Sequence, residues 1–317
     1  MTPTSARLTS VFEAARKEPI HFDDDSRFII FSDCHRGDNG WSDDFAHNQI
    51  LFFHALDHYF AEGFTYIELG DGDELWENQD FDEIRLQHDH IFWQMQRFYT
   101  ADPGRLRLIW GNHDIVRKDP KTVETQLYQY WDDRTKAYRP LFPGLRMHEG
   151  LVLQHHDTQQ QLFVVHGHQG SWINDRFWRV SRFATRHFWR HAQLLGVPDP
   201  TRPAQNPKAR NDVERQLSAW ALANQCVLIC GHTHRSQFPT PESPPYFNVG
   251  SCVHPRCITG IEIRGPEIEL IKWWLKPISG SLRIEKDSIV GPRALASYDL
   301  PAGYRRLPSR RPLRAAG

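Results

Sequence analysis

Five short apolar segments of the sequence each run into a turn that carries aspartate, asparagine or histidine. The segments with their turns read IIFSDCH (29–35), YIELGD (66–71), LRLIWGNHD (106–114), LFVVHGH (162–168) and VLICGHTH (227–234). Short apolar runs bounded by glycine or polar turns are typical of buried strands. Because the carboxyl ends of strands in a layered α/β sheet meet at one rim, this pattern constrains both the fold and the place of a site.

Helical patterns separate several of these strands. Residues 45–60, 81–99 and 211–224 place apolar side chains at helical spacing. Strands that alternate with helices predict an α/β layered domain. Strand-like stretches at 151–165 and 246–273 indicate a second sheet, which we expect to be partly mixed or antiparallel.

The domain organisation follows from where these patterns begin and end. We expect a lead-in at residues 1–26, one domain over residues 27–300, and a tail at 301–317. The tail is basic and rich in proline and glycine, which is typical of a disordered segment. Within the domain, residues 171–210 are predicted to form a helical insertion or lid, with its helix at 171–196.

The composition excludes several classes of protein. The net charge of −1 gives no overall attraction to nucleic acid or to anionic membranes, so no stable nucleic-acid partner is expected. Five cysteines are too few and too scattered for a disulfide framework. The sequence shows neither an apolar run long enough to span a membrane nor a signal-peptide pattern, so we expect a cytoplasmic protein.

The polar residues at the strand ends form a mixed set of oxygen and nitrogen donors. Carboxylates, one amide and several imidazoles suit manganese, iron or zinc better than calcium. Seven ligands are too many for one open catalytic metal, but they fit two metals if Asp71 bridges them. Two metals about 3.5–4 Å apart are the usual arrangement for in-line displacement at phosphorus. The predicted ligands are Asp33, His35, Asp71, Asn112, His166, His232 and His234.

Three neighbours of these ligands have predicted roles of their own. His113 follows the ligand Asn112, and we expect it to protonate the leaving oxygen. Asp114 is expected to orient His113 or to stabilise its charge, as a carboxylate does for imidazole elsewhere. Cys34 lies between two ligands and is interpreted as a spacer that points away from the metals.

The order of these motifs resembles the calcineurin-like metallophosphoesterase superfamily. That family has D-x-H, G-D-x-x-[DE], G-N-H-[DE], H and G-H-x-H in this order, and all five blocks occur here between residues 31 and 234. The blocks are Asp33-Cys34-His35, Gly70-Asp71-Gly72-Asp73-Glu74, Gly111-Asn112-His113-Asp114, His166 and Gly231-His232-Thr233-His234.

The resemblance implies a four-layer αββα sandwich of two mixed β-sheets flanked by helices. It implies His113 as the catalytic histidine and Glu74 as a residue that supports the ligands. One metal would be held by Asp33, His35, Asp71 and His234, and the second by Asp71, Asn112, His166 and His232.

Within the superfamily, the stretch from His166 to GHTHR is similar in layout to the UDP-2,3-diacylglucosamine pyrophosphatase branch. Both have H-G, a helical insertion, a second helix and GHTHR. That branch usually has arginine where this chain has His113 and aspartate where it has His168. The resemblance therefore favours the hydrolytic centre more strongly than the lipid substrate.

The predicted insertion helix has an aromatic face and a stripe of arginines. Four interpretations stay open: a helix packed on the core with solvated arginines, a lid whose arginines contact phosphate, a membrane-contacting surface at 172–195, and a surface that stacks on nucleic-acid bases. The candidate substrate contacts of the whole chain are Arg36, Asp38, His168, Arg179 and Arg182.

These observations predict a binuclear-metal phosphohydrolase. A metal-bridging hydroxide is expected to attack the phosphorus of a phosphomonoester or phosphodiester of a small molecule or nucleotide in line. One alternative is a pyrophosphatase that cleaves a nucleotide-linked lipid such as UDP-2,3-diacylglucosamine, peripheral at the inner membrane surface. Another is a non-catalytic scaffold, against which the complete ligand set argues. Manganese is the first choice of metal, with iron and zinc as alternatives, and the oligomeric state stays open.

Overall fold

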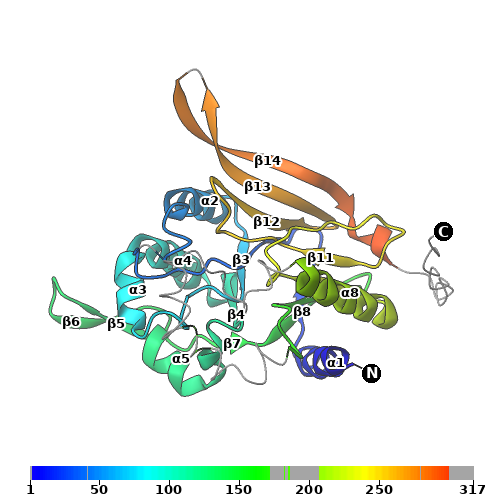
Figure 1. The fold of residues 1–317 in the computed structure, drawn as a ribbon, viewed down its shortest axis with the longest axis horizontal. Helices are drawn as coiled ribbons and strands as arrows, with labels where there is room; N and C mark the ends of the chain where they lie inside the picture. The colour runs from blue at the N-terminus through cyan, green and yellow to red at the C-terminus, as the bar shows by residue number, and fades with distance from the viewer. Residues whose placement is uncertain are drawn as a thin grey trace, which may run out of the picture.

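Two β-sheets lie between two layers of helices in the computed structural model (Figure 1). The structure describes residues 2–40, 42–171, 182, 185, 207–278 and 280–299. The first sheet has the order β1 (Ile20–Phe22), β8 (Gly150–His155), β9 (Gln161–Val165), β10 (Val227–Cys230) and β11 (Tyr246–Asn248). The second has the order β14 (Ser281–Ala294), β13 (Glu267–Ile278), β12 (Cys257–Arg264), β2 (Arg27–Phe31), β3 (Thr65–Leu69), β4 (Leu106–Ile109) and β7 (Met147–His148).

Both sheets are mixed, as the sequence predicts. Strands β2, β3, β4 and β7 run parallel, whereas β12, β13 and β14 are antiparallel to their neighbours. In the first sheet, β8 and β9 pair antiparallel and the other pairs are parallel. A separate ribbon joins β5 (Gln129–Asp132) to β6 (Ala137–Pro140).

Helices cover the outer face of each sheet. The helices are α1 (Pro3–Ala15), α2 (Gln49–Ala61), α3 (Phe81–Gln87), α4 (Asp89–Ala101), α5 (Pro120–Leu127) and α8 (Pro207–Asn224), with 3-10 turns η1 (Pro103–Arg105), η2 (Ile115–Lys118) and η6 (Leu295–Tyr298). The predicted helix at 81–99 is two helices, because the chain leaves helical geometry at His88, which ends α3 and precedes α4.

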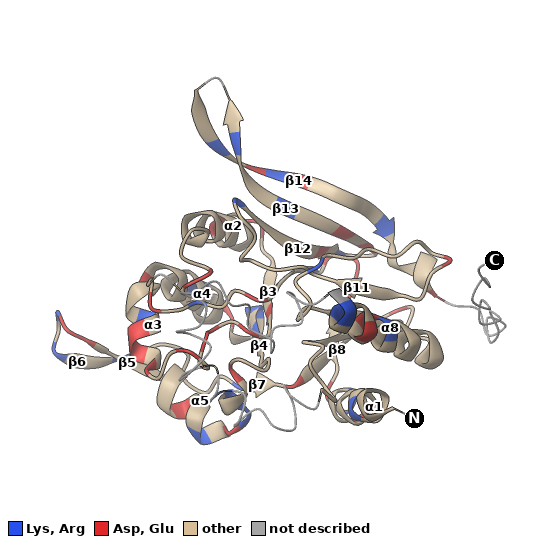
Figure 2. Cartoon of the chain, viewed as in Figure 1, with Lys and Arg blue, Asp and Glu red and all other residues tan. Residues whose placement is uncertain are grey.

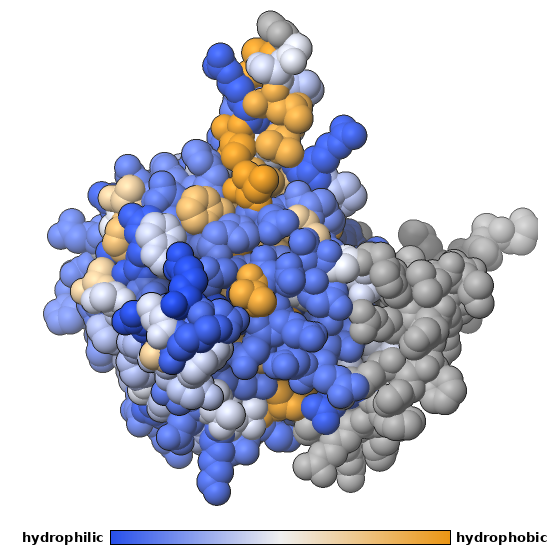
Figure 3. Space-filling view, turned by 90° about the vertical axis from the view of Figure 1, so that its left-hand side faces the viewer, coloured by the Kyte–Doolittle hydropathy of each residue, from blue (hydrophilic) through white to orange (hydrophobic). Residues whose placement is uncertain are grey.

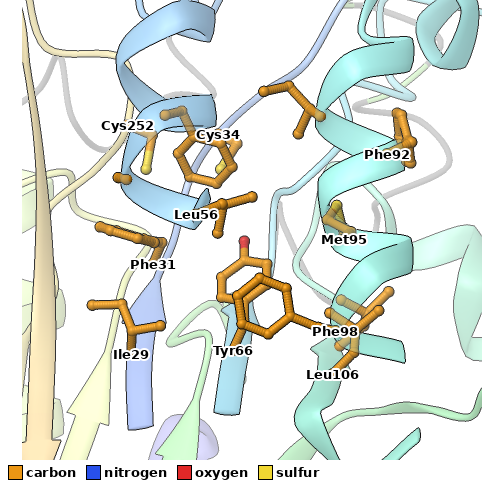
Figure 4. Close-up of a cluster of buried hydrophobic side chains, with 14 of the residues drawn as sticks. Ile29, Phe31, Cys34, Leu56, Tyr66, Phe92, Met95, Phe98, Leu106 and Cys252 are labelled. Carbon is orange, nitrogen blue, oxygen red and sulfur yellow. The ribbon is translucent and has the colours of Figure 1, made fainter. Parts of the chain in front are cut away.

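Three apolar clusters show that the layers form a four-layer αββα sandwich. The first packs α2 and α4 on the second sheet, and Figure 4 shows part of it, with Cys34 and Cys252 among apolar side chains. The second fills the space between the sheets, with Ile30 from one and Val164 from the other. The third packs α1 and α8 on the first sheet. The predicted fold class is therefore confirmed.

The first 26 residues belong to this sandwich, although their sequence suggests a lead-in. Leu8 and Val11 of α1 are buried against the first sheet, and β1 pairs in parallel with β8. Apolar residues on one face of a short helix are enough for this packing, but their partners are distant in sequence. The predicted insertion helix at 171–196 and the tail at 301–317 lie outside the described residues, apart from Ser171, Arg182 and Thr185.

Candidate metal centre

The predicted ligands converge on one rim, directly after the ends of five strands. Residues 33 and 35 follow β2, Asp71 follows β3, Asn112 follows β4, His166 follows β9, and residues 232 and 234 follow β10. Three groups of donor atoms form there, and within each group the atoms lie within 4.8 Å of one another; one of the three is His35, Glu74 and His113, and the other two consist of predicted ligands alone. Of these two, the first group is Asp33, His35 and His234, and the second is Asp71, His166 and His232.

Asp71 joins the two groups. Its Oδ1 accepts a hydrogen bond from the backbone N–H of His113 at 2.8 Å. Its Oδ2 lies 3.1 Å from Nε2 of His166 in the second group and 3.8 Å from Nε2 of His35 in the first. One carboxylate oxygen is therefore fixed by the backbone while the other lies between both sets of imidazoles.

Asp33 divides its two oxygens in the same way. Its Oδ2 accepts hydrogen bonds from the Ser32 hydroxyl at 2.6 Å and from the backbone N–H of His232 at 2.9 Å. Its Oδ1 lies 3.1 Å from Nε2 of His234, yet this buried oxygen has no hydrogen-bond partner. The oxygen that faces the histidines is thus the one without a hydrogen bond.

His166 presents a lone pair to the same space. Its Nδ1 donates a hydrogen bond to the carbonyl oxygen of Leu69 at 2.9 Å, so Nε2 is the nitrogen that must give up its proton, and then offers its lone pair, when a metal binds. Nε2 of His166 and Oδ1 of Asn112 are both buried and have no hydrogen-bond partner. Buried acceptors that converge without a donor fit a cation, since such atoms are normally satisfied in folded proteins.

The electrostatics of the site suit metal binding. Burial opposes ionisation of Asp33 and Asp71, but the surrounding histidines outweigh it and hold both pKa values well below the usual range. Burial, with the charge of His166, lowers the pKa of His232 to about 3. Burial also lowers the pKa of His166, but Asp71 and Asp33 outweigh it and raise that pKa to about 9. Ionised carboxylates and a neutral His232 are the forms that coordinate metals.

The backbone is strained at the same residues. Left-handed φ angles are uncommon for residues with a side chain, and they cluster at functional sites. A Cβ at Gly111 would clash with Oδ1 and the backbone nitrogen of Asp71, so glycine is required for the close approach of β4 to the site. The predicted ligands with positive φ are Asp33 (53°), His35 (50°), Asp71 (49°), His232 (68°) and His234 (55°).

Glu74 supports two histidines at once. His35 donates from Nδ1 to Oε2 of Glu74 at 2.9 Å, and His113 donates from Nδ1 to Oε1 at 2.7 Å. The ring of His113 also stacks on Trp76, with 4.4 Å between ring centroids. Burial opposes ionisation of Glu74, but His113 and His35 outweigh it and keep its pKa well below the usual range. A carboxylate behind a metal-binding histidine fixes the ring and its tautomer.

The predicted orienting role of Asp114 is not what the structure shows. Its oxygens accept hydrogen bonds from the backbone N–H groups of Gly111 at 2.6 Å and Gly72 at 3.2 Å. Burial and the charge of Asp71 raise its pKa to about 7. Within the described part of the chain, the carboxylate bonded to the His113 ring is that of Glu74. Adjacency in sequence favoured Asp114, but the turn after β4 directs its side chain to the backbone.

Arg36 is also placed differently from the prediction of a substrate contact. It is 1% exposed and donates to both oxygens of Glu68, at 2.6 and 2.8 Å. It also donates from Nε to Asp73 at 2.7 Å, and Arg117 bonds the other oxygen of Asp73. This buried network under the rim occupies the guanidinium of Arg36. A sequence pattern gives little sign of it, because Arg36 directly follows a ligand and looks like part of the site.

The other candidate contacts have different environments. His168 is buried, with its ring centroid 5.4 Å from that of His166, and neither of its ring nitrogens has a hydrogen-bond partner. Asp38 is half-buried and accepts a hydrogen bond from the backbone N–H of Gly40. Arg179 lies outside the described residues, and Arg182 is a half-buried residue within that same segment.

Two residues outside the ligand set have clear structural roles. Cys34 is fully buried in the apolar cluster under α2, so it points away from the ligands as predicted. Asn248 donates from its amide to the carbonyl oxygen of Gly231 at 2.7 Å and to the hydroxyl of Thr233 at 3.2 Å. It therefore holds the turn that carries His232 and His234.

Comparisons with known proteins found distant structural similarities and no sequence match. No family model matches the sequence, and no curated protein matches it. The structure is similar to a single mutant of Vps29 from Entamoeba histolytica, with 15% identity, a TM-score of 0.34 and coverage of 83% of this chain and 99% of that chain. It is also similar to Vacuolar Protein Sorting 29 from Cryptosporidium parvum, with 12% identity, a TM-score of 0.34 and coverage of 84% of this chain and 98% of that chain. Vps29 from Chaetomium thermophilum is similar as well, with 11% identity, a TM-score of 0.38 and coverage of 84% of this chain and 97% of that chain. At such low TM-scores, these similarities carry no conclusion about what this chain does.

Proposed function

We propose that this chain is a binuclear-metal phosphohydrolase of the calcineurin-like metallophosphoesterase type. The observation that carries the proposal is the position of Asp71 Oδ2, which lies 3.1 Å from a histidine of one donor group and 3.8 Å from a histidine of the other. A carboxylate between two such groups is what a bridging ligand requires. The orphaned acceptors Asp33 Oδ1, Asn112 Oδ1 and His166 Nε2 support the same assignment.

The residues fit two cations. Asp33, His35, Asp71 and His234 would hold one, and Asp71, Asn112, His166 and His232 the other. Bound metals would supply Lewis acidity to the phosphoryl group and to a water molecule. Manganese is the first choice, with iron or zinc as alternatives, because the donors are carboxylate, amide and imidazole.

We assign the transfer of a proton to the leaving oxygen to His113. Glu74 accepts the Nδ1 hydrogen of His113, so Nε2 is the nitrogen left for a substrate. The ring has little freedom to turn, because it stacks on Trp76 and lies 4.7 Å from the His35 ring. A positioned imidazole of this kind contributes about 10²–10⁴-fold as a general acid.

The proposed substrate class is phosphomonoesters or phosphodiesters of small molecules or nucleotides. A pyrophosphatase that acts on a nucleotide-linked lipid is the second candidate, favoured by the layout of residues 166–234. The first candidate predicts that the chain hydrolyses soluble phosphate esters, whereas the second predicts that it does not. A non-catalytic scaffold is the third, and it would not need the buried donor set to be complete.

The test is an assay of the full chain after removal of metals and reconstitution with Mn²⁺. The measurements are metal content per chain and hydrolysis of p-nitrophenyl phosphate and bis-p-nitrophenyl phosphate. Turnover of either ester that disappears with chelator and returns with metal supports the esterase. If neither ester is cleaved while two metals are bound, the general esterase is excluded, and a nucleoside diphosphate linked to a lipid becomes the next substrate to assay.

A further inference from the structure

The hairpin formed by β13 and β14 extends well beyond the body of the protein (Figure 1). Up to Trp273 it is covered by α2: this side chain is 4% exposed and donates a hydrogen bond to the Tyr59 hydroxyl at 3.1 Å. Beyond Trp273 the two strands continue to pair as far as Ile278 and Ser281, and no helix of the described residues lies beside them. A two-stranded ribbon without further packing is only marginally stable in water, so this extension needs a reason.

Apolar side chains are concentrated at the end of the hairpin. Pro277 pairs with Leu282, and Leu275 pairs with Ile284, so these four side chains share the face that Trp273 presents to the core. Leu282 is 67% exposed. Figure 3 shows the projecting hairpin with hydrophobic residues gathered on it, above a body whose visible surface is mainly hydrophilic.

The charges near the tip have one sign. Residues 274–284 contain two cations, Lys276 and Arg283, and no acidic residue. The two cations face each other across the strands, and Figure 2 shows basic positions on both strands just below the tip. Lys276 bonds Glu285 at 2.7 Å, on the side toward the body. Among the described residues, no carboxylate forms a salt bridge with Arg283.

The order of these layers along the hairpin matches that of a membrane surface. Ile278 and Leu282 come first, the cations Lys276 and Arg283 lie behind them, and a stretch of mixed charge with Glu285, Lys286 and Asp287 lies farther back. From Lys276 to Ile278 the strand rises about 7 Å, which is within the ~5–10 Å to which interfacial apolar faces enter a bilayer. Cations at that height meet the phosphates of anionic lipids.

The other ribbon of the molecule has no such order. Between β5 and β6, residues 132–136 read DDRTK, so two acids and two bases occur together at the turn. Tyr138 of that ribbon is 64% exposed, nearly as much as Leu282. Each ribbon thus has an exposed large side chain near its end, and the two differ in whether cations alone accompany it.

We propose that the tip of the β13–β14 hairpin is a docking site for an anionic lipid bilayer. The tip inserts Ile278 and Leu282 among the acyl chains, and Lys276 and Arg283 contact lipid phosphates. This proposal does not depend on the metal centre, because the hairpin lies outside the donor groups. Hairpin variants are accordingly expected to keep metal content and turnover of soluble esters.

The experiment is co-sedimentation of the full chain with phosphatidylcholine vesicles, with and without phosphatidylglycerol. We expect binding only to the anionic vesicles, weakened by salt. Leu282→Asp is expected to weaken vesicle binding about tenfold or more, since it removes a leucine side chain that becomes buried in the bilayer. Lys276→Gln and Arg283→Gln are each expected to weaken it about fivefold. Tyr138→Asp is the matched control, expected to bind as wild type does.

Three outcomes would overturn the proposal. One is no binding of the wild-type chain to anionic vesicles. Another is binding that the hairpin variants leave unchanged, which would place the contact elsewhere, such as at residues 172–195. The last is a wild-type dimer that Leu282→Asp converts to a monomer without any effect on vesicles, which would make the tip an arm for a second copy. Light scattering after size-exclusion chromatography reports that last outcome, and circular dichroism checks that each variant is folded.

Discussion

Oε1 of Glu74 lies 2.7 Å from Nδ1 of His113, while Oε2 of the same carboxylate lies 2.9 Å from Nδ1 of His35. One buried side chain therefore sets the orientation of the proposed general acid and of a proposed metal ligand together. This coupling makes Glu74 the most informative residue around the ligand set.

Glu74→Gln is expected to lower kcat by about 10–100-fold, the range typical of carboxylates that support metal-bound histidines. The amide can no longer accept from both rings, so His113 and His35 lose their fixed tautomers. The measurement is steady-state hydrolysis of an aryl phosphate by the metal-loaded chain. Asp114→Asn is the comparison variant, and a larger loss with Asp114→Asn than with Glu74→Gln would reverse the assignment made here.

His113→Ala is expected to lower kcat by about 10²–10⁴-fold while the metal content per chain stays unchanged. His113 belongs to a third donor group, with His35 and Glu74, which we do not assign to a metal because both rings hydrogen-bond Glu74 there. The loss should be smaller for esters with good leaving groups, because these need less protonation. Loss of bound metal together with activity would show that His113 is a ligand and not an acid.

Removal of metal is expected to destabilise the protein. Five predicted ligands are held at positive φ, and the two central carboxylates are buried among histidines. A metal that binds the folded chain only, at 100 times its dissociation constant, stabilises it by about 2.7 kcal/mol. The unfolding temperature should therefore rise with Mn²⁺ and fall with chelator. A His166→Ala variant that responds to Mn²⁺ as fully as wild type would contradict its place in the site.

Arg36→Met is expected to reduce the free energy of unfolding by about 3–5 kcal/mol, because it leaves the buried Glu68 carboxylate without its guanidinium and leaves Asp73 with Arg117 alone. Arg36→Met combined with Glu68→Gln should reduce the free energy of unfolding by less than Arg36→Met alone, since the negative charge of Glu68 is then removed as well. Urea unfolding of the metal-loaded variants measures both. If Arg36→Met instead leaves stability unchanged and raises KM, Arg36 is a substrate contact after all.

His148 gives the pH dependence of stability a definite sign. Burial, with the charges of Arg146 and Arg107, lowers the pKa of His148 to about 4 from 6.5. The unfolded chain therefore binds a proton at this histidine below pH 6.5 while the folded chain does not, so stability is lost as the pH falls from 6.5 toward 4.

His148→Asn is expected to reduce the loss of unfolding free energy between pH 6.5 and pH 4 by on the order of 1–2 kcal/mol. The measurement is urea unfolding of the metal-loaded chain across that pH range. His47→Asn, at an exposed position, is the matched control. A His148→Asn curve parallel to wild type would contradict the account of this residue.

The strand ends explain why so much of the site could be predicted. The ligands after β2, β3, β4, β9 and β10 occupy turns whose glycines and histidines follow directly from apolar runs. Parallel pairing then brings residues 33, 71 and 112 to the same rim without any further information. The pairing of β9 with β10 does the same for His166 and His232.

What the sequence did not reveal depends on side-chain direction and on distant partners. Asp114 adjoins His113, yet its carboxylate turns to the backbone of Gly111, whereas Glu74 reaches the ring from another loop. The packing of α1 on the first sheet, and the length of the β13–β14 hairpin, depend on contacts between residues far apart in the chain. Periodicity reports which face of an element is apolar, and it does not report what covers that face.

The described part of the chain has no helix that is both long and apolar enough to cross a bilayer. Peripheral contact through the hairpin is the membrane mode that we propose, and contact through residues 172–195 is a separate proposal. The vesicle experiment distinguishes the two, since only the hairpin variants alter the first.

The bridging role of Asp71 is the central claim, and electron paramagnetic resonance of the Mn²⁺-reconstituted chain tests it most directly. The account predicts two Mn²⁺ per chain with the spectrum of a spin-coupled pair, and loss of that coupling in Asp71→Asn. A single Mn²⁺ per chain, or two ions with no magnetic coupling in the wild type, would contradict it.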